Sequence, residues 1–404
     1  MNILDQSEQL LSDLSTLQII YAQEEFPTFV NKSIFLAGPT PRDDETPSWR
    51  PEVISYLRQH GYNGTIYIPE PRTKQRYKDY DKQFEWEHKA LDRADIILFY
   101  IPRDLSPNIN GHPKMAALTT NIEYGLYADS NRLVVCIPED KINVSSNKYI
   151  QNCCFERQTP FYTSLDEALN KIIQTLGTGA DRYNGECCVP LLIWENEQFQ
   201  NWYQAQKLVG NELKYLKCNY TFVMPKARLL FLWICHVEVF VKAENRIKSN
   251  EFVLSRSDIS SVVMYYPGKT LDDTYIVLIK EFRSPCDNNE CMVYELPGGS
   301  SNSQKPPIEV AADEIKEETG IVIDKNRLQL IDTRQAAATL SAHKIHAYKI
   351  ELTTDEFNMI KSMEGSIHGL EEDTERTYLV IKSLAEILSN NLLDWANIGM
   401  IMSA

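Results

Sequence analysis

The chain has 404 residues, which predicts two or three domains at about 150 residues per domain. Apolar residues make up 43% of it and charged residues 24%, so collagen-like sequence and wholesale disorder are excluded. The 41 Lys and Arg residues face 56 Asp and Glu residues, and a net charge of −15 opposes general binding to nucleic acid or anionic membrane.

The nine cysteines are scattered and include no CxxC pair, so the sequence lacks zinc-ligand spacing. An odd number of dispersed thiols suits a reducing compartment. Residues 1–31 carry no Lys or Arg and do not have the pattern of a secretory signal. The most apolar run, residues 229–241, is too short to span a bilayer. We therefore expect a cytoplasmic protein with no membrane partner.

Residues 1–32 carry apolar side chains at helical spacing, which predicts a helical extension that packs on its own domain or on a partner. From residue 33, short apolar runs alternate with segments of helical spacing. Strands are expected at 34–37, 65–68, 95–101 and 132–137, and helices at 48–60, 83–93, 117–128 and 165–176. This alternation predicts an α/β doubly wound, flavodoxin-like domain over residues 33–178, with its ligand at the carboxyl ends of the strands.

Glycines at residues 177–179 interrupt this pattern and indicate a linker. We assign residues 179–244 to the linker and to an N-terminal extension of a second domain. Beyond the linker, β-rich runs at 229–241, 262–266, 275–279 and 329–331 surround one strong helix at 308–319. This order predicts an α+β domain over residues 245–404.

The first predicted strand ends in a tight turn, and Glu123 lies near the start of a later helix. The turn contains Gly38 and Pro39 and would let backbone N–H groups approach a phosphate or a sugar. Glu123 has two interpretations. With Thr120 it forms a capping box, in which it would only cap the helix. Alternatively, it lies at the ligand-facing end of the sheet as a nucleophile toward a sugar C1.

Three segments, FLAGPT, FEWE with LDRADIILFYIP, and TTNIEYGLYA, together resemble the nucleoside 2-deoxyribosyltransferase superfamily, which includes deoxynucleoside phosphate N-hydrolases. The resemblance implies that Glu123 forms a glycosyl-enzyme intermediate. It also implies substrate contacts at Gly38, Pro39, Glu87 and Asp95, with the two acids orienting sugar hydroxyls. Each acid has a structural alternative, because Asp95 would equally cap a strand and Glu87 would equally lie at the surface.

The helix at 308–319 places three glutamates on one face. Glu314, Glu317 and Glu318 are spaced i, i+3 and i+4, and Gly320 follows where a glycine would end the helix. Three carboxylates on one face repel one another unless a cation neutralises them, and hard oxygen ligands suit Mg²⁺ or Mn²⁺. Such a site would bind diphosphate oxygens and activate water. The alternative is an ordinary solvated acidic face.

This segment resembles the Nudix hydrolases, whose pattern is GX5EX7REUXEEXGU with U aliphatic. The residues that match the pattern are Gly299, Glu314, Ile315, Glu317, Glu318, Gly320 and Ile321. Lys305 replaces the first Glu of the pattern and Asp313 replaces its Arg, so both charges are inverted. We predict that these two residues form the bracing ion pair of the family with its ends exchanged. The resemblance implies a metal site at Gly298, Glu314, Glu317 and Glu318.

Two further segments resemble the ADP-ribose pyrophosphatase branch of that family. EFR at 281–283, followed by ELPGG, implies that Arg283 contacts a phosphate or a terminal ribose. An acidic loop at 369–375 implies that Glu371 or Glu372 (or Glu375) positions the attacking water. The alternatives are a surface residue for Arg283 and a solvated turn for the loop.

The sequence thus predicts a bifunctional nucleotide-processing enzyme. The first domain would cleave or transfer an N-glycosidic bond, and the second would hydrolyse an ADP-ribose-like diphosphate with Mg²⁺ or Mn²⁺. The expected partners are nucleosides or nucleotides, and a homo-oligomer is compatible with the sequence. The alternative is a non-catalytic nucleotide-binding sensor or regulator, which the inverted Lys305 and Asp313 favour.

Overall fold

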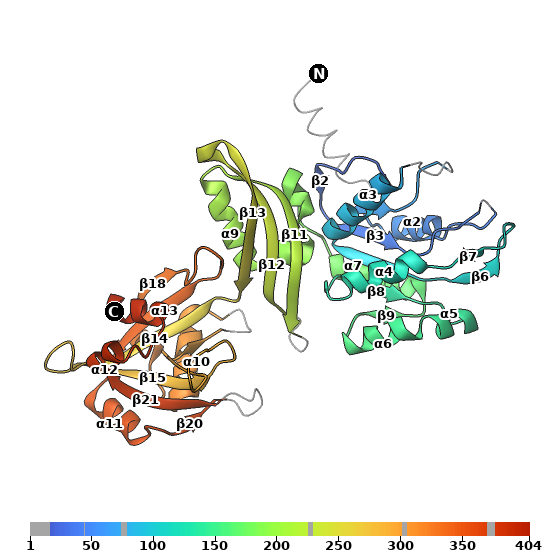
Figure 1. Cartoon of the computed structure of the whole chain (residues 1–404). Coiled ribbons are helices and arrows are strands. Elements are labelled where there is room, and N and C mark those ends of the chain that lie inside the picture. The colour runs from blue at the N-terminus through green and yellow to red at the C-terminus, as the bar shows by residue number, and fades with distance from the viewer. Residues whose placement is uncertain (1–16, 44, 74–78, 225–228, 301–304, 370–375) are drawn as a thin grey trace. The chain divides into compact units, whose positions relative to one another are not determined.

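The computed structural model describes residues 17–43, 45–73, 79–224, 229–300, 305–369 and 376–404 (Figure 1). The chain divides into two compact units, Met1–Val253 and Leu254–Ala404. Among the described residues, the helices are all too short or too polar to cross a membrane.

A six-stranded parallel sheet forms the centre of the first unit. Its strands in spatial order are β1 (Gln18–Tyr21), β4 (Thr65–Ile68), β3 (Ser33–Ala37), β5 (Ile96–Tyr100), β8 (Leu133–Cys136) and β9 (Phe161–Tyr162). The four central strands are almost wholly buried, which explains why they consist of continuous apolar runs. The predicted α/β fold of this region is confirmed.

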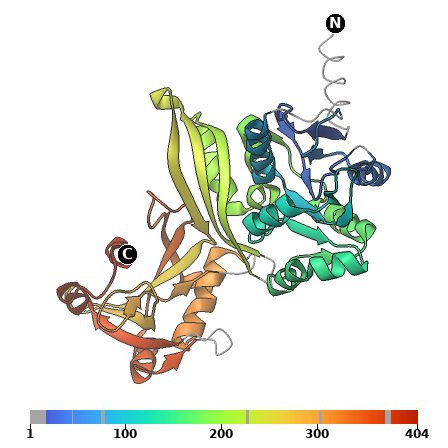
Figure 2. The same ribbon diagram turned by 45° about the vertical axis from the view of Figure 1, so that its right-hand side comes forward.

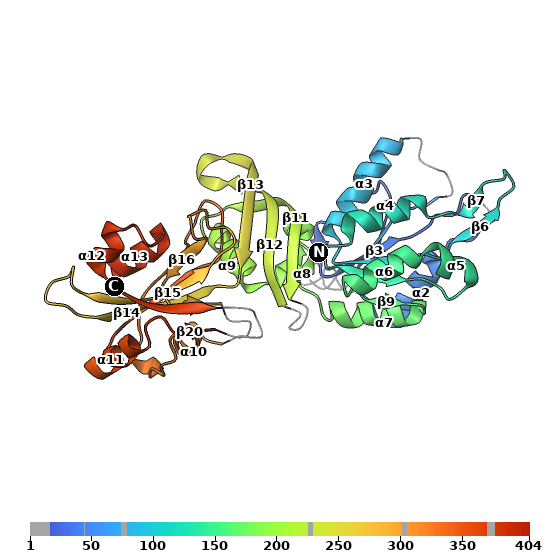
Figure 3. The ribbon, with the colours of Figure 1, turned by 60° about the horizontal axis from the view of Figure 1, so that its bottom comes forward.

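Helices cover both faces of this sheet because successive strand residues point to opposite sides. Phe35 packs with α3 (Tyr80–Arg93), α4 (Leu118–Tyr127) and α6 (Lys148–Glu156). Figure 3 shows these three helices. Leu36 packs on the other face with α2 (Arg50–Gln59) and α7 (Leu165–Leu176). The smaller elements are β6 (Asp104–Pro107), β7 (Pro113–Met115) and α5 (Lys141–Ser146).

The order of the strands places a crevice between β3 and β5. From β3 the chain continues to β4 on one side and then crosses to β5 on the other side. In open α/β sheets, ligands bind at such a switch point, outside the carboxyl ends of the strands. The site that the sequence predicts at these ends therefore coincides with the crevice.

One part of the predicted N-terminal extension is a strand. Residues Gln18–Tyr21 form β1, which pairs in parallel with β4, and Ile20 is buried. Apolar residues at positions 17 and 20 fit a helical pattern, but sheet pairing gives this short run its backbone partners. Residues 1–16 lie outside the described residues.

Residues 179–253 belong to the first unit, although the sequence assigns residues 179–244 to a linker and an extension of the second domain. Strand β10 (Arg182–Tyr183) pairs with β2 (Phe29–Val30). The remaining elements are η1 (Asn184–Cys188), α8 (Leu191–Trp194), α9 (Glu197–Leu208) and η2 (Lys242–Glu244). With them lies a three-stranded sheet in the order β11 (Glu212–Met224), β12 (Leu229–Val241) and β13 (Arg246–Arg256) (Figure 2).

A buried ion pair joins this segment to the parallel sheet. The Arg182 guanidinium donates to both carboxylate oxygens of Asp95, at 2.6 and 2.7 Å, and both side chains are fully buried. Asp95 also accepts from the backbone N–H groups of Ser33 at 2.7 Å and Leu191 at 2.6 Å. Asp95 therefore holds together three segments that are distant in sequence: the start of β3, the start of β5 and residues 182–191.

The second unit has a mixed eight-stranded sheet between two helical layers. The sheet comprises β14 (Ile259–Tyr266), β15 (Tyr275–Phe282), β16 (Met292–Glu295), β17 (Gly298–Gly299), β18 (Gln329–Arg334), β19 (Ile345–Glu351), β20 (Ile367–His368) and β21 (Thr377–Ser383). Strand β14 is parallel to β19 and antiparallel to β15. Helices α10 (Pro307–Thr319) and α11 (Thr354–Ser362) pack on one face, and α12 (Leu384–Ser389) and α13 (Trp395–Ser403) on the other. A short η3 (Lys325–Arg327) follows α10.

We predict that Asp95→Ala lowers the free energy of unfolding by about 3–5 kcal/mol, because it leaves the buried Arg182 without its counter-charge. Denaturant titration followed by tryptophan fluorescence would measure the loss. Asp129→Ala is the control, since its ion pair with Arg157 is exposed and should contribute about 0–1 kcal/mol. Equal losses in the two variants would contradict the role assigned to Asp95.

Candidate functional site

The chain leaves β3 through a turn that only glycine permits. A Cβ atom on Gly38 would overlap the carbonyl oxygen of Tyr100 and lie 2.7 Å from the Trp49 ring. The indole N–H of Trp49 donates to the carbonyl of Pro39 at 3.1 Å, and Pro39 is buried. The predicted residue Gly38 thus borders the crevice, whereas Pro39 shapes the turn and is not among the residues found to line the cavity.

Arg50, which is 1% exposed, fixes two loops of the crevice at once. Its guanidinium donates to the carbonyls of Leu36 at 3.2 Å and Gly38 at 3.0 Å, and to the Thr40 hydroxyl at 3.3 Å. It also forms an ion pair with Glu70, which follows β4. The sequence analysis did not identify Arg50. Its buried charge therefore organises the chain on both sides of the switch point.

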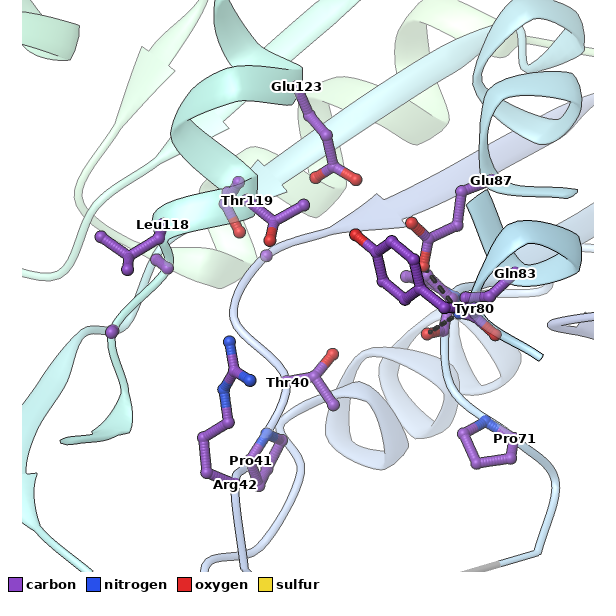
Figure 4. Close-up of a pocket in the computed structure, with 15 residues that line it drawn as sticks. Thr40, Pro41, Arg42, Pro71, Tyr80, Gln83, Glu87, Leu118, Thr119 and Glu123 are labelled. Carbon is purple, nitrogen blue, oxygen red and sulfur yellow. Dashed lines mark hydrogen bonds between the residues drawn. The ribbon is translucent and has the colours of Figure 1, made fainter. Parts of the chain in front are cut away.

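A cavity of about 270 Å³ opens at this edge of the sheet (Figure 4). Three segments line it: the loop after β3, the loop after β4 with the first turns of α3, and the start of α4. The residues that line the cavity include Thr40, Arg42, Tyr80, Gln83, Glu87, Leu118, Thr119 and Glu123. The structure thus brings the predicted residues Gly38, Glu87 and Glu123 into one cavity.

Two carboxyl groups enter this cavity from different helices. Figure 4 shows Glu87 on α3 and Glu123 on α4 with their carboxyl groups directed into it. The pKa of Glu123 is raised from 4.5 to about 8, mainly by burial and also by the charge of Glu87, while the charge of Arg50 opposes the rise. Burial also raises the pKa of Glu87, against a hydrogen bond of 2.7 Å from Gln83 and the charge of Arg50. Carboxyl groups with shifted pKa values in a cleft are typical of acid–base or nucleophilic sites.

The capping-box interpretation of Glu123 does not fit the structure. Helix α4 begins at Leu118, and its N-cap residue, Ala117, provides no side-chain cap. Thr120 therefore lies inside the helix and is buried, and Glu123 lies in the second turn with its side chain toward the cavity. Ala117 has a φ of 56°, a left-handed conformation that costs a non-glycine residue about 1–3 kcal/mol.

Arg103 supports this strained start of α4. Its guanidinium donates to the carbonyl of Ala116 at 2.5 Å, to Asn147 at 2.6 Å and to the side chain of Asn121. The backbone N–H of Arg103 donates to the side-chain oxygen of Asn143 at 2.7 Å. Arg103 is not predictable from a local motif, and its one signal in the sequence is its place shortly after β5.

Asp95 does not lie in the cavity, contrary to the predicted substrate contact. It is at the amino end of β5, whereas the cavity is at the carboxyl ends of the strands. Its carboxylate oxygens accept bonds from Arg182, Ser33 and Leu191 and have no exposed surface. We therefore replace the predicted sugar contact by the structural role described above.

In the second unit, α10 holds the predicted glutamates against a pair of glycines. The N–H of Gly298 donates to the carboxylate of Glu318 at 2.8 Å, and a Cβ on Gly299 would lie 2.5 Å from a carboxylate oxygen of Glu314. Glu318 is buried and Glu314 is half-buried, as is Glu317. Gly320 ends the helix with a φ of 74°, as predicted. These glutamates therefore do not form the fully solvated acidic face of the alternative interpretation.

The predicted ion pair of Lys305 with Asp313 is confirmed, with an N–O distance of 2.7 Å. Arg283 forms ion pairs with Glu281 and Glu295, each at 2.9 Å. Glu371 and Glu372 lie outside the described residues. Within the described ranges, no three His, Cys, Asp or Glu side chains are arranged so that they would hold a metal ion as they lie.

The comparison with protein families agrees with the first of the two resemblances. Residues 31–141 match a family model described as nucleoside 2-deoxyribosyltransferase like, and this range includes Gly38, Glu87 and Glu123. A search of curated proteins finds no match to the chain. The family match ends within the first unit, so it gives no support to the Nudix resemblance of the second. The chain thus carries a nucleoside 2-deoxyribosyltransferase-like domain at residues 31–141.

We predict that Glu123→Gln stabilises the first unit at alkaline pH. Because its folded-state pKa of about 8 exceeds its ordinary 4.5, Glu123 favours folding in the protonated form, and this contribution disappears as pH rises from 4.5 through 8. The variant should therefore melt above the wild type at pH 9, by a few degrees, and show much less difference at pH 5. Glu85→Gln, at an exposed position of α3, is the control. A melting difference that does not change with pH would contradict the burial of this carboxyl group.

Proposed function

We propose that the first unit cleaves or transfers the N-glycosidic bond of a nucleoside or nucleotide, with Glu123 as the nucleophile. The observation that carries the proposal is the position of the Glu123 carboxyl group. It lies in a cavity at the switch point of the sheet, beside Glu87, within the residues that match the family model. The cavity is large enough for a sugar and part of a base.

The proposed reaction has two steps. The Glu123 carboxylate attacks C1 of the sugar, so an oxygen–carbon bond forms while the C1–N bond breaks and its electron pair leaves with the base, which takes up a proton. Water then attacks C1 and gives up a proton, which balances the proton taken up by the base, while the bond between C1 and the Glu123 oxygen breaks and the carboxylate is restored. In a transfer reaction, the nitrogen of a second base replaces water. The net result is retention of configuration at C1.

Glu87 has a supporting part in this proposal. Its hydrogen bond from Gln83 fixes its orientation toward the cavity, where it would accept hydrogen bonds from sugar hydroxyls. Its charge also raises the pKa of Glu123. Only the ionised form of Glu123 attacks C1. The value of kcat/KM, which reports the ionisation of the free enzyme, should therefore rise with pH through about 8.

We predict that Glu123→Gln lowers base release by about 10³-fold or more, because the amide cannot act as the nucleophile. Chromatographic detection of the free base from a nucleotide substrate would measure it, with Glu85→Gln as the matched control. In the wild type, kcat/KM should rise with an apparent pKa near 8, and Glu87→Gln should shift that pKa downward. Wild-type base release by Glu123→Gln would refute the assignment.

We further propose that the second unit hydrolyses the diphosphate of an ADP-ribose-like compound. Three observations support this: the partial burial of three like charges on α10, the glycine pair that they face, and the ion pair of Lys305 with Asp313. Glu314, Glu317 and Glu318, on one face of α10, would hold Mg²⁺ or Mn²⁺ together with Gly298. When bound, such a cation neutralises diphosphate charge and lowers the pKa of water. Arg283 would contact a phosphate or a ribose.

We predict that Glu317→Gln weakens Mn²⁺ binding and lowers Mg²⁺-dependent AMP release from ADP-ribose, each by at least about tenfold. Calorimetry would measure Mn²⁺ binding and chromatography the AMP. Glu309→Gln is the control on the same helix, because Glu309 pairs with Lys325 at the surface. Unchanged metal binding in Glu317→Gln would exclude this site. If the wild type shows neither base release nor AMP release, the regulator interpretation is favoured.

A further inference from the structure

Strands β11 and β12 place two cysteines opposite each other (Figure 1). Cys218 and Cys235 are partners in the register of this antiparallel pair. The Cα atoms of such partners are about 4.5–5.5 Å apart, which lies within the range of about 4.4–6.8 Å that a disulfide spans. The two thiols also interact directly, because the Cys235 thiol donates a hydrogen bond to Cys218. A disulfide can therefore join them without a large movement of either strand.

Contacts on both sides of Cys218 hold it in this position. The preceding residue, Lys217, forms an ion pair with Asp92 at 3.1 Å. Three residues further along β11, the Thr221 hydroxyl accepts a hydrogen bond of 3.0 Å from Asn131. The ladder with β12 is irregular directly after Cys218, so the backbone there is less constrained by ladder hydrogen bonds. The strand is thus anchored on the parallel-sheet part of the unit, while the position of Cys218 itself can adjust to a bridge.

The two thiols differ in their surroundings. Cys218 is half-buried, whereas Cys235 is fully buried. The hydrogen bond from Cys235 lowers the pKa of Cys218, burial opposes this change, and the charge of Arg132 lowers the pKa further. Burial raises the pKa of Cys235 and of four other thiols, which are those of Cys136, Cys154, Cys187 and Cys188. Cys218 therefore combines greater thiolate character with the access that an oxidant needs.

We propose that Cys218 and Cys235 form a reversible intrachain disulfide when the protein meets hydrogen peroxide. The Cys218 thiolate attacks one peroxide oxygen, the O–O bond breaks and hydroxide leaves, which gives a sulfenic acid at Cys218. The Cys235 sulfur then attacks the Cys218 sulfur, the S–O bond breaks and the hydroxyl group leaves as water with the thiol proton. The released hydroxide takes up the proton that Cys218 lost. In total, two thiols and one peroxide give one disulfide and two water molecules, and a thiol reductant reverses the change.

Peptide mapping of the full chain tests the proposal. The protein is treated with a small excess of hydrogen peroxide, its remaining thiols are alkylated, and it is digested with trypsin without reduction. Lys226 and Arg228 separate the two cysteines, so mass spectrometry would detect the disulfide as two linked peptides. We expect these linked peptides from the wild type, and we expect dithiothreitol to remove them. Non-reducing electrophoresis should show a single-chain product, and oxidation should raise the melting temperature of the first unit by a few degrees.

Two variants separate the roles of the thiols. Cys235→Ala should give no linked peptides, but dimedone should capture its Cys218 as the sulfenic acid, whereas Cys218→Ser should give neither product at these positions. Cys153→Ala is the control, since Cys153 is a half-buried cysteine of α6 and its loss should leave the disulfide intact. Circular dichroism would confirm that each variant is folded. The proposal is overturned if peroxide leaves Cys218 of the wild type as a thiol, or if Cys218 becomes linked to a cysteine other than Cys235.

Discussion

The crevice of the first unit depends on the buried guanidinium of Arg50. A single planar group with five donors satisfies the carbonyl of Leu36 in β3 and that of Gly38 directly after it, and pairs with Glu70 after β4. A lysine in this place would offer one point of charge and would not reach both loops. The charge of the buried Arg50 also acts on the acids of the cavity. It opposes the raised pKa values of Glu87 and Glu123.

In the proposed reaction, this combination of shape and charge would determine how readily Glu123 ionises. Burial alone would hold both carboxyl groups in the neutral form, in which neither would act as a nucleophile. Complete solvation would ionise both, and they would be ordinary surface charges. Partial burial beside a fixed cation places Glu123 between these limits, at the cost of some folding stability, as is common for active sites. The strained Ala117 and its support by Arg103 belong to the same arrangement, because they determine where α4 begins.

The sequence was sufficient to predict the α/β fold of the first unit and two of its cavity acids, since apolar alternation and local motifs depend on neighbouring residues. It was not sufficient for Arg50 and Arg103, because nothing in a local pattern indicates which carbonyl a long side chain will meet. The predicted sugar contact of Asp95 was wrong for the same reason, whereas its alternative as a structural residue at the start of a strand agrees with its hydrogen bonds. Its partner Arg182 is 87 residues away. The capping-box alternative for Glu123 failed because the start of α4 is set by distant contacts and not by Thr120.

In the second unit the motif is compact, so the pairing of Lys305 with Asp313 was predictable. The attraction between two charges depends on their product, and exchanging their signs therefore preserves the brace. The exchange of signs does not preserve the electric field around α10. The negative end of the pair now lies on α10 next to Glu314, and the positive end lies on the preceding segment. The Nudix pattern that this segment resembles has an arginine at that helical position. Asp313 instead adds a negative charge to α10, which, under the function proposed for the second unit, would strengthen the attraction of this helix face for a divalent cation.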